Sequence, residues 1–203
     1  MSREPKLAVA CLLTRWYNLS LEATLQASGF DDDNVAFING NNDATSDIVV
    51  SGALGPDDQS WAAQHVQMWR KCAASNDPIL IFQEDVVFSS DNVHLATKAL
   101  AREVGDVPEL IIFLGATEPD REPSSAVSSI ASACRLPACF ASSTAAYVLW
   151  PTAARALLNS LPLDVPVPAF LGRHVAARKV AALMAVPALV VSEESLASLE
   201  IST

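Results

Sequence analysis

The sequence is poor in positive charge and has no long apolar run. It contains 13 Lys and Arg residues against 23 Asp and Glu residues, which gives a net charge of −10 at pH 7. Nucleic acids and anionic membranes attract clustered Lys and Arg, so this balance argues against both as partners. The longest apolar runs, at 7–13 and 181–191, fall short of the roughly 18 residues that a bilayer span needs. The sequence therefore predicts no nucleic-acid partner and no membrane span.

The first residues also lack the pattern of a secretion signal. Glu4 and Pro5 stand where a basic region is expected, and Thr14 and Arg15 end the apolar stretch too early. We therefore expect a cytoplasmic protein whose four cysteines remain thiols. A disulfide between Cys134 and Cys139 stays open as the alternative in an oxidising compartment.

Hydrophobic residues make up 51% of the 203-residue chain, which suits a single globular domain with a sizeable core. Short continuous apolar runs are typical of buried strands, and spacings of three and four residues are typical of amphipathic helices. We expect strands at 7–13, 35–38, 79–82, 110–114, 145–149 and 188–191, and helices at 19–28, from Ser60 to about 75, at 95–103, at 152–160 and up to about 178. Loops should fill 39–60 and 116–143. The alternation predicts an α/β, Rossmann-like fold over about 7–198, with a mostly parallel sheet flanked by helices.

Two acidic residues, Glu84 and Asp85, directly follow the apolar strand at 79–82. In an open parallel sheet, ligands bind at the carboxyl ends of the strands. Two carboxylates there can hold a divalent cation, which in turn can bind a diphosphate that this acidic protein would otherwise repel. The alternative is that Asp85 caps the next turn and Glu84 is only solvated.

Five blocks of the chain, in order, resemble the family 25 glycosyltransferases, which include bacterial lipooligosaccharide galactosyltransferases and procollagen galactosyltransferases. The blocks are 64–69 (QHVQMW), 79–88 (ILIFQEDVVF), 111–115 (IIFLG), 146–158 (AYVLWPTAARALL) and 165–171 (VPVPAFL). The resemblance implies a GT-A fold. It also implies a hexosyltransferase that moves galactose or glucose from a UDP-sugar to a hydroxyl of a carbohydrate, a lipid-linked acceptor or a protein, with a divalent cation, usually Mn²⁺.

The resemblance also assigns roles to residues. The metal motif of the family aligns with Gln83, Glu84 and Asp85, so Glu84 and Asp85 are the expected metal ligands and catalytic residues, and Gln83 is expected to contact the donor. His65 matches a histidine of the preceding helix and is a candidate catalytic residue. Because His65 lies on the apolar helix face, the alternative is a core histidine with a satisfied hydrogen bond.

Two departures from the family pattern matter, besides Gln64, which stands where the family has Ser. Gln83 replaces an acid of the metal motif, and Pro168 replaces the usual Asp of a Pro-Val-Asp segment, so a carboxylate is lost at each position. These losses favour an alternative function, a catalytically inactive member that binds a nucleotide or a sugar. A third hypothesis is an unrelated α/β domain with a structural or interaction role.

The remaining donor-binding candidates lie after the first strand and in the basic C-terminal part of the chain. Thr14 and Arg15 follow the first strand, where a nucleotide would be met in this architecture. Residues 123–192 hold five basic residues against one acidic residue, and three of the basic ones, Arg173, Arg178 and Lys179, are candidates for the donor diphosphate. Their alternative is a solvated helix face.

Overall fold

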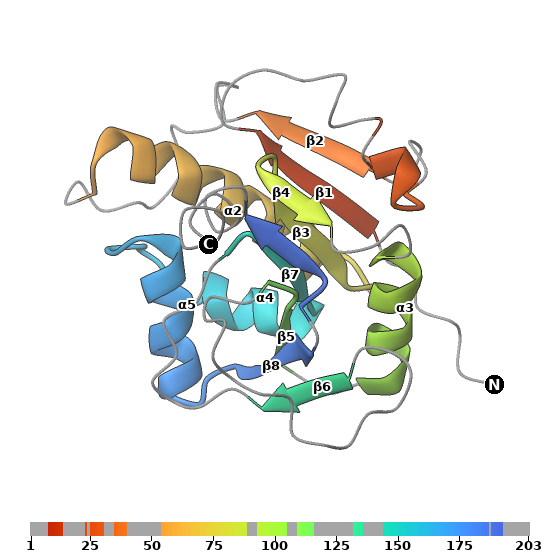
Figure 1. Ribbon diagram of the computed structural model, residues 1–203. Helices are drawn as coiled ribbons and strands as arrows, with labels where there is room; N and C mark the ends of the chain where they lie inside the picture. Colours follow the sequence, from red (N-terminus) through yellow and green to blue (C-terminus); the bar gives the residue numbers. More distant parts are fainter. Residues whose placement is uncertain are drawn as a thin grey trace, which may run out of the picture.

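The computed structural model describes residues 8–13, 23, 25–30, 35–39, 54–88, 93–104, 109–115, 132–135, 144–186 and 188–192 (Figure 1). These residues form an α/β fold built on one seven-stranded sheet, in the order β2-β1-β3-β7-β5-β8-β6. The strands are β1 (Ala8–Leu13), β2 (Val35–Asn39), β3 (Ile79–Gln83), β5 (Leu110–Phe113), β6 (Ser132–Arg135), β7 (Ala146–Leu149) and β8 (Ala181–Val186).

Five strands of this sheet run in one direction. The pairs β1–β2, β1–β3 and β5–β8 are parallel. β7 is antiparallel to both of its neighbours, β3 and β5, and β6 is antiparallel to β8. The predicted α/β class is confirmed, and the sheet is mixed, because an antiparallel strand lies at its centre.

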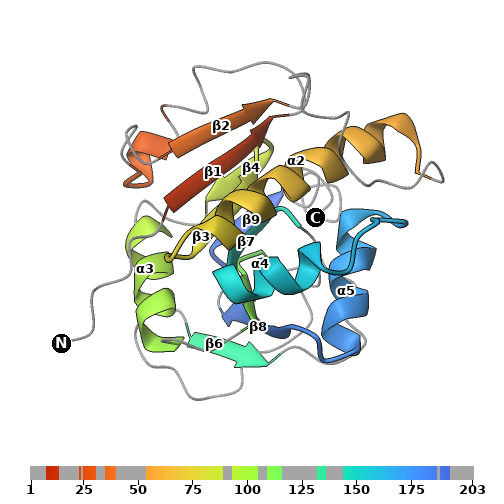
Figure 2. The same cartoon turned by 180° about the vertical axis from the view of Figure 1, so that it is seen from behind.

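Helices cover both faces of the sheet. α2 (Pro56–Ala74), α4 (Pro151–Leu158) and α5 (Val167–Ala176) share a hydrophobic core with one face, and α3 (Val93–Val104) shares a core with the other. Figure 2 shows α2 and α4 in front of the sheet. In β3, Ile79 and Ile81 belong to the first core and Leu80 and Phe82 to the second. Burial on both faces explains why the central strands are continuous apolar runs without polar alternation.

A second, two-stranded sheet lies beyond the end of β3. β4 (Val86–Phe88) pairs antiparallel with β9 (Val190–Ser192), and Gly115, two residues beyond β5, bridges to Val190. The chain that leaves β3 is therefore tied to the chain that leaves β5. The residues between β3 and β4 are Glu84 and Asp85, which form the connecting turn.

Several predicted element boundaries are wrong. α2 begins at Pro56 instead of after Ser60, because a proline at the first position and acidic residues in the first turn form a favourable helix start. β6 lies inside the predicted loop at 116–143, β8 was not predicted, and the last strand, predicted at 188–191, is β9 at Val190–Ser192. Of the predicted helix at 19–28, residues 23 and 25–27 are described and are helical. Within the described ranges, none of the helices is both long enough and apolar enough to cross a bilayer.

Candidate functional site

The acidic turn lies at the carboxyl edge of the sheet. Glu84 and Asp85 follow β3 directly, and both are partly buried. Gln83 anchors the turn, since its backbone N–H donates to the Ala145 carbonyl (2.8 Å) and its Nε2 donates to Thr144 Oγ1 (3.2 Å). The candidate site is therefore held at the last residue of β3 by the chain that enters β7.

The first strand ends at the same edge. β1 is parallel to β3, and Leu12 pairs with Gln83, so the carboxyl ends of the two strands are neighbours. Thr14 and Arg15, which follow β1 in sequence, lie outside the described residues. Their predicted contact with a donor nucleotide stays a prediction.

The acidic turn fits a cation only if the ligand brings further oxygen atoms. Among the described residues, no group of three or more His, Cys, Asp or Glu side chains converges as a metal centre. Glu84 and Asp85 supply two carboxylates, and the amide nitrogen of Gln83 is engaged with Thr144. Mg²⁺ is usually bound by one or two carboxylates together with substrate phosphates and water. The turn is therefore compatible with a cation that arrives with a diphosphate.

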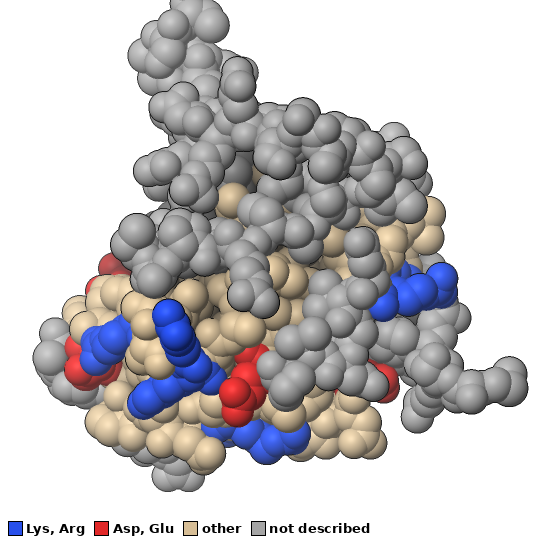
Figure 3. All heavy atoms as spheres, turned by 90° about the horizontal axis from the view of Figure 1, so that it is seen from below, with Lys and Arg blue, Asp and Glu red and all other residues tan. Residues whose placement is uncertain are grey.

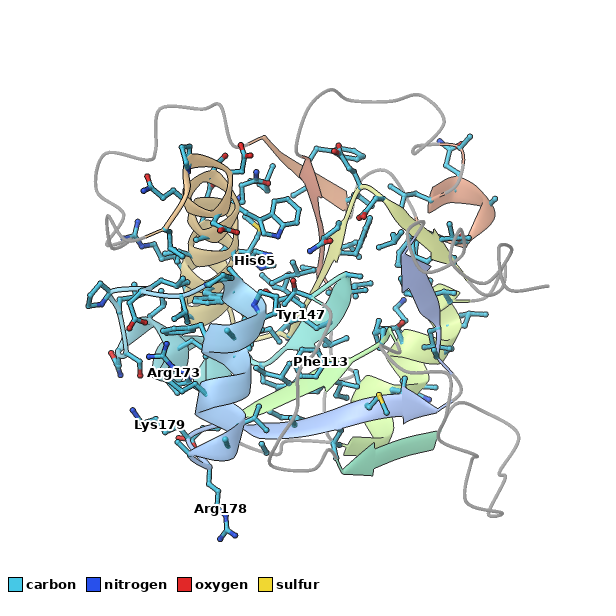
Figure 4. All side chains as sticks on the ribbon, turned by 60° about the vertical axis from the view of Figure 1, so that its left-hand side comes forward. His65, Phe113, Tyr147, Arg173, Arg178 and Lys179 are labelled. Carbon is cyan, nitrogen blue, oxygen red and sulfur yellow. The ribbon has the colours of Figure 1, made fainter. Side chains whose placement is uncertain are left out.

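The structure buries His65, the predicted catalytic histidine, in the core between α2 and β7. Its side chain is 0% exposed, its Nδ1 lies 2.7 Å from the Tyr147 hydroxyl, and the two rings stack with centroids 5.8 Å apart (Figure 4). Trp69 Nε1–H donates to the same hydroxyl (3.0 Å). Burial lowers the pKa of His65 to about 3 and raises the pKa of Tyr147. A neutral, enclosed imidazole cannot touch a substrate in solvent, so the structure favours the core interpretation of His65.

Arg173 is engaged in an ion pair on the surface. Its guanidinium donates to both carboxylate oxygens of Asp164, at 3.1 and 3.3 Å, and both side chains are about half exposed. The hydrogen bond from Arg173 lowers the pKa of Asp164. Asp164 therefore neutralises the charge that was predicted to meet a diphosphate.

Arg178 and Lys179 lie at the opposite edge of the sheet from the acidic turn. They directly precede β8, which runs in the same direction as β3, so they mark the amino end of the parallel strands. β8 is three inter-strand steps of about 4.8 Å from β3, and the register puts Asp85 and Lys179 on opposite sides of the level that Ile79 and Ala182 share. Figure 4 shows both side chains pointing outward below α5. The structure does not bring them to the acidic turn, and their predicted contact with a donor diphosphate stays a prediction.

The surface seen from below carries charges of both signs. Basic and acidic side chains lie near one another among the described residues, without a broad area of one sign (Figure 3). Arg178 itself has a backbone role at the end of α5. Its φ is 56°, its N–H donates to the Val175 carbonyl, and the N–H of Lys179 donates to the His174 carbonyl (3.0 Å each). This pattern is a Schellman motif, in which Arg178 takes the left-handed position that usually belongs to glycine.

The fold accounts for Pro168, the second departure from the family pattern. Pro168 lies in the first turn of α5, whose N-cap is Pro166. A backbone N–H has no helical partner in the first turn, so proline costs nothing there. The substitution suits the helix start and supplies no side chain that could bind an acceptor or take a proton.

Thr144 is a site residue that sequence reasoning missed. Its hydroxyl accepts the hydrogen bond from Gln83, 61 positions away in the chain, and it is buried. No local spacing signals a contact of that sequence separation; only the antiparallel pairing of β3 with β7 brings the two together.

For the cysteines, the structure describes the side chain of Cys72. Cys72 is a buried free thiol whose Sγ donates to the Leu149 carbonyl (3.2 Å), and burial raises its pKa. The side chain of Cys134 and all of Cys139 lie outside what the structure describes, so the alternatives for that pair stay open.

Comparisons with known proteins assign no family. No protein-family model matches the chain, and no curated protein is significantly similar to it. The resemblance to family 25 glycosyltransferases therefore rests on the five sequence blocks alone.

Proposed function

We propose that the protein is a glycosyltransferase with a GT-A-like fold that transfers galactose or glucose from a UDP-sugar to a hydroxyl acceptor. The observation that carries the proposal is the placement of Glu84 and Asp85. They lie side by side at the carboxyl end of β3, where an open α/β sheet binds nucleotides. The ordered sequence blocks of the resemblance give the reaction class.

The two carboxylates have a defined task in this proposal. Asp85 and Glu84 would hold a divalent cation, such as Mn²⁺, that comes with the donor diphosphate. Such a cation supplies neutralisation of the charge that develops on the leaving UDP. Gln83 keeps the turn in place through Thr144 and contributes no charge.

A second function is favoured by the two lost acids. Gln83 presents an amide where the family has a carboxylate, and Pro168 is part of a helix start. A chain with these residues keeps Glu84 and Asp85 for a cation but has no carboxylate at position 83 or 168 to take a proton from the acceptor. The second candidate is therefore a nucleotide-sugar binding protein without transfer activity.

The test measures binding and turnover separately. UDP, UDP-galactose and UDP-glucose are titrated calorimetrically into the protein with and without Mn²⁺, and donor hydrolysis and transfer to simple sugars are followed in the same buffers. We expect Mn²⁺-dependent binding and expect Asp85→Asn to weaken it at least tenfold. Binding with turnover supports the transferase, and binding without turnover supports the second candidate.

Asp77→Asn is the matched control, because Asp77 lies two residues before β3 and Asp85 lies two residues after it. The same chemical change is then made at opposite ends of one strand. We expect Asp77→Asn to bind UDP as the wild type does. Absence of any UDP binding in the presence of Mn²⁺, or equal binding by the two variants, would remove the acidic turn as the site and the proposal with it.

A further inference from the structure

The buried network around His65 leaves one side of the imidazole without a partner. His65 Nδ1 contacts the Tyr147 hydroxyl, but His65 Nε2 is buried and has no hydrogen-bond partner among the described residues. In the same turn of α2, the Oε1 atom of Gln64 is also buried without a partner. Buried polar atoms are normally paired, by protein or by ordered water. Each unpaired atom therefore indicates a polar partner that the described residues do not supply.

Counting protons identifies which nitrogen of His65 is protonated. The Tyr147 oxygen accepts from Trp69 Nε1–H, and the hydroxyl has a single proton to donate. If that proton goes to His65 Nδ1, then of the polar groups of His65, Tyr147 and Trp69 only His65 Nε2–H has no partner among the described residues. If instead His65 Nδ1–H donates to Tyr147, both the hydroxyl proton and the Nε2 lone pair lack partners within the described residues. The first arrangement leaves one unpaired group and the second leaves two.

We propose that Tyr147 holds His65 as the neutral tautomer with its proton on Nε2, so that His65 donates a hydrogen bond to the oxygen atom of a buried water molecule. Tyr147 is then a positioning residue and His65 is not a base, because its only lone pair is occupied. Gln64 Oε1 is a separate buried acceptor, because adjacent residues of a helix do not face each other.

Neither the tautomer nor the buried water depends on the proposed transferase function. The test therefore begins with the ligand-free protein, labelled with ¹⁵N in histidine. Long-range proton–nitrogen correlation shows which ring nitrogen is protonated, and the His65 signal is identified by its loss in His65→Gln. We expect a proton on Nε2 only, with no change between pH 8 and pH 5. A proton on Nδ1, or titration within that range, overturns the proposal.

Two variants separate the positioning role from a merely structural one. Tyr147→Phe removes the group that occupies Nδ1, so the His65 signal should show a mixture of tautomers. Trp69→Phe removes the other partner of the hydroxyl and should leave the proton of His65 on Nε2. An unchanged tautomer in a folded Tyr147→Phe variant would contradict the proposal that Tyr147 holds the proton of His65 on Nε2. If that variant does not fold, the wild-type tautomer and its retention in Trp69→Phe decide the question.

The occupant is identified on the same signal. A nuclear Overhauser effect from Nε2–H to water, with no change on adding UDP-galactose, identifies a water molecule. A shift of the His65 signal on adding UDP-galactose would show that a ligand reaches the imidazole, and it would overturn the buried water as its partner. A coupling through the hydrogen bond from Nε2 to a backbone carbonyl would show that the chain supplies the acceptor, and it would overturn the proposed site.

Discussion

Lowering the pH from 7.5 to 5.0 should weaken the fold through His65. This histidine is fully buried, and burial lowers its pKa to about 3, against an ordinary value of 6.5 in the unfolded chain. Below pH 6.5 the unfolded chain binds a proton at this position and the folded protein does not. The stability that His65 contributes is therefore fully present above pH 6.5 and is lost as the pH falls towards 3.

The size of the loss follows from the two pKa values. Each pH unit below the unfolded pKa costs about 1.4 kcal/mol for one proton. Between pH 7.5 and pH 5.0, the free energy of unfolding should fall by roughly 2 kcal/mol through this residue alone. The folded pKa lies below this range, so the loss is not yet limited by protonation of the native state.

Urea unfolding of the wild type and of His65→Gln at pH 7.5, 6.5, 5.5 and 5.0 measures this contribution. His65→Gln starts from a lower stability, but its stability should fall by roughly 2 kcal/mol less across the range. Thr97→Val, a change at a buried side chain of α3 that does not titrate, is the control and should keep the wild-type pH dependence. Parallel pH profiles for wild type and His65→Gln would refute the assignment of His65 as a neutral core residue.

Three further changes test features of the backbone and of the surface. Arg178→Gly should raise stability by about 1 kcal/mol, because glycine adopts a φ of 56° without strain, whereas Arg178→Ala should not, and equal thermal midpoints would contradict the strain. Arg178→Ala combined with Lys179→Ala should leave the calorimetric affinity for UDP with Mn²⁺ unchanged, since both residues lie at the far edge of the sheet. A clear loss of affinity would show that they contact the nucleotide. Gly115→Ala should cost about 1 kcal/mol, because a Cβ there comes within 3.3 Å of the Val190 carbonyl oxygen, whereas Gly55→Ala meets nothing closer than 4.0 Å; equal effects on urea midpoints would count against this.

The central strands were predictable because the pattern that identifies each strand lies within its own residues. β3 and β5 are continuous apolar runs, and α4 begins at a proline, so each carries its own signal. The direction of β7 had no such signal, since an apolar strand reads the same whether it is parallel or antiparallel. β4 and β9 are only three residues long and exist through their mutual pairing, which sequence periodicity does not reveal.

The acidic turn was predictable for the same reason, and the other site residues were not. Glu84 and Asp85 are found by their position directly after an apolar run. His65 is held by Tyr147, which lies 82 positions away in the chain. Arg173 is paired with Asp164, which lies three residues before α5. Whether a titratable side chain meets solvent or a partner is decided by such tertiary contacts, so a motif position alone could not separate a catalytic histidine from a core histidine.

The basic residues of the segment 123–192 show why a local charge balance does not make a binding face. Arg155 donates to the Ala73 carbonyl (2.8 Å), Arg173 is paired with Asp164, and Arg178 and Lys179 lie at the amino edge of the sheet. Among the described residues, this segment therefore brings no free cationic side chain to the acidic turn. Two carboxylates at the carboxyl edge would repel a bare diphosphate, and the positive charge that such a ligand needs has to arrive with it. If the turn binds a nucleotide, its affinity should therefore rise with Mn²⁺ concentration, and affinity that is independent of the cation would exclude this turn as the diphosphate site.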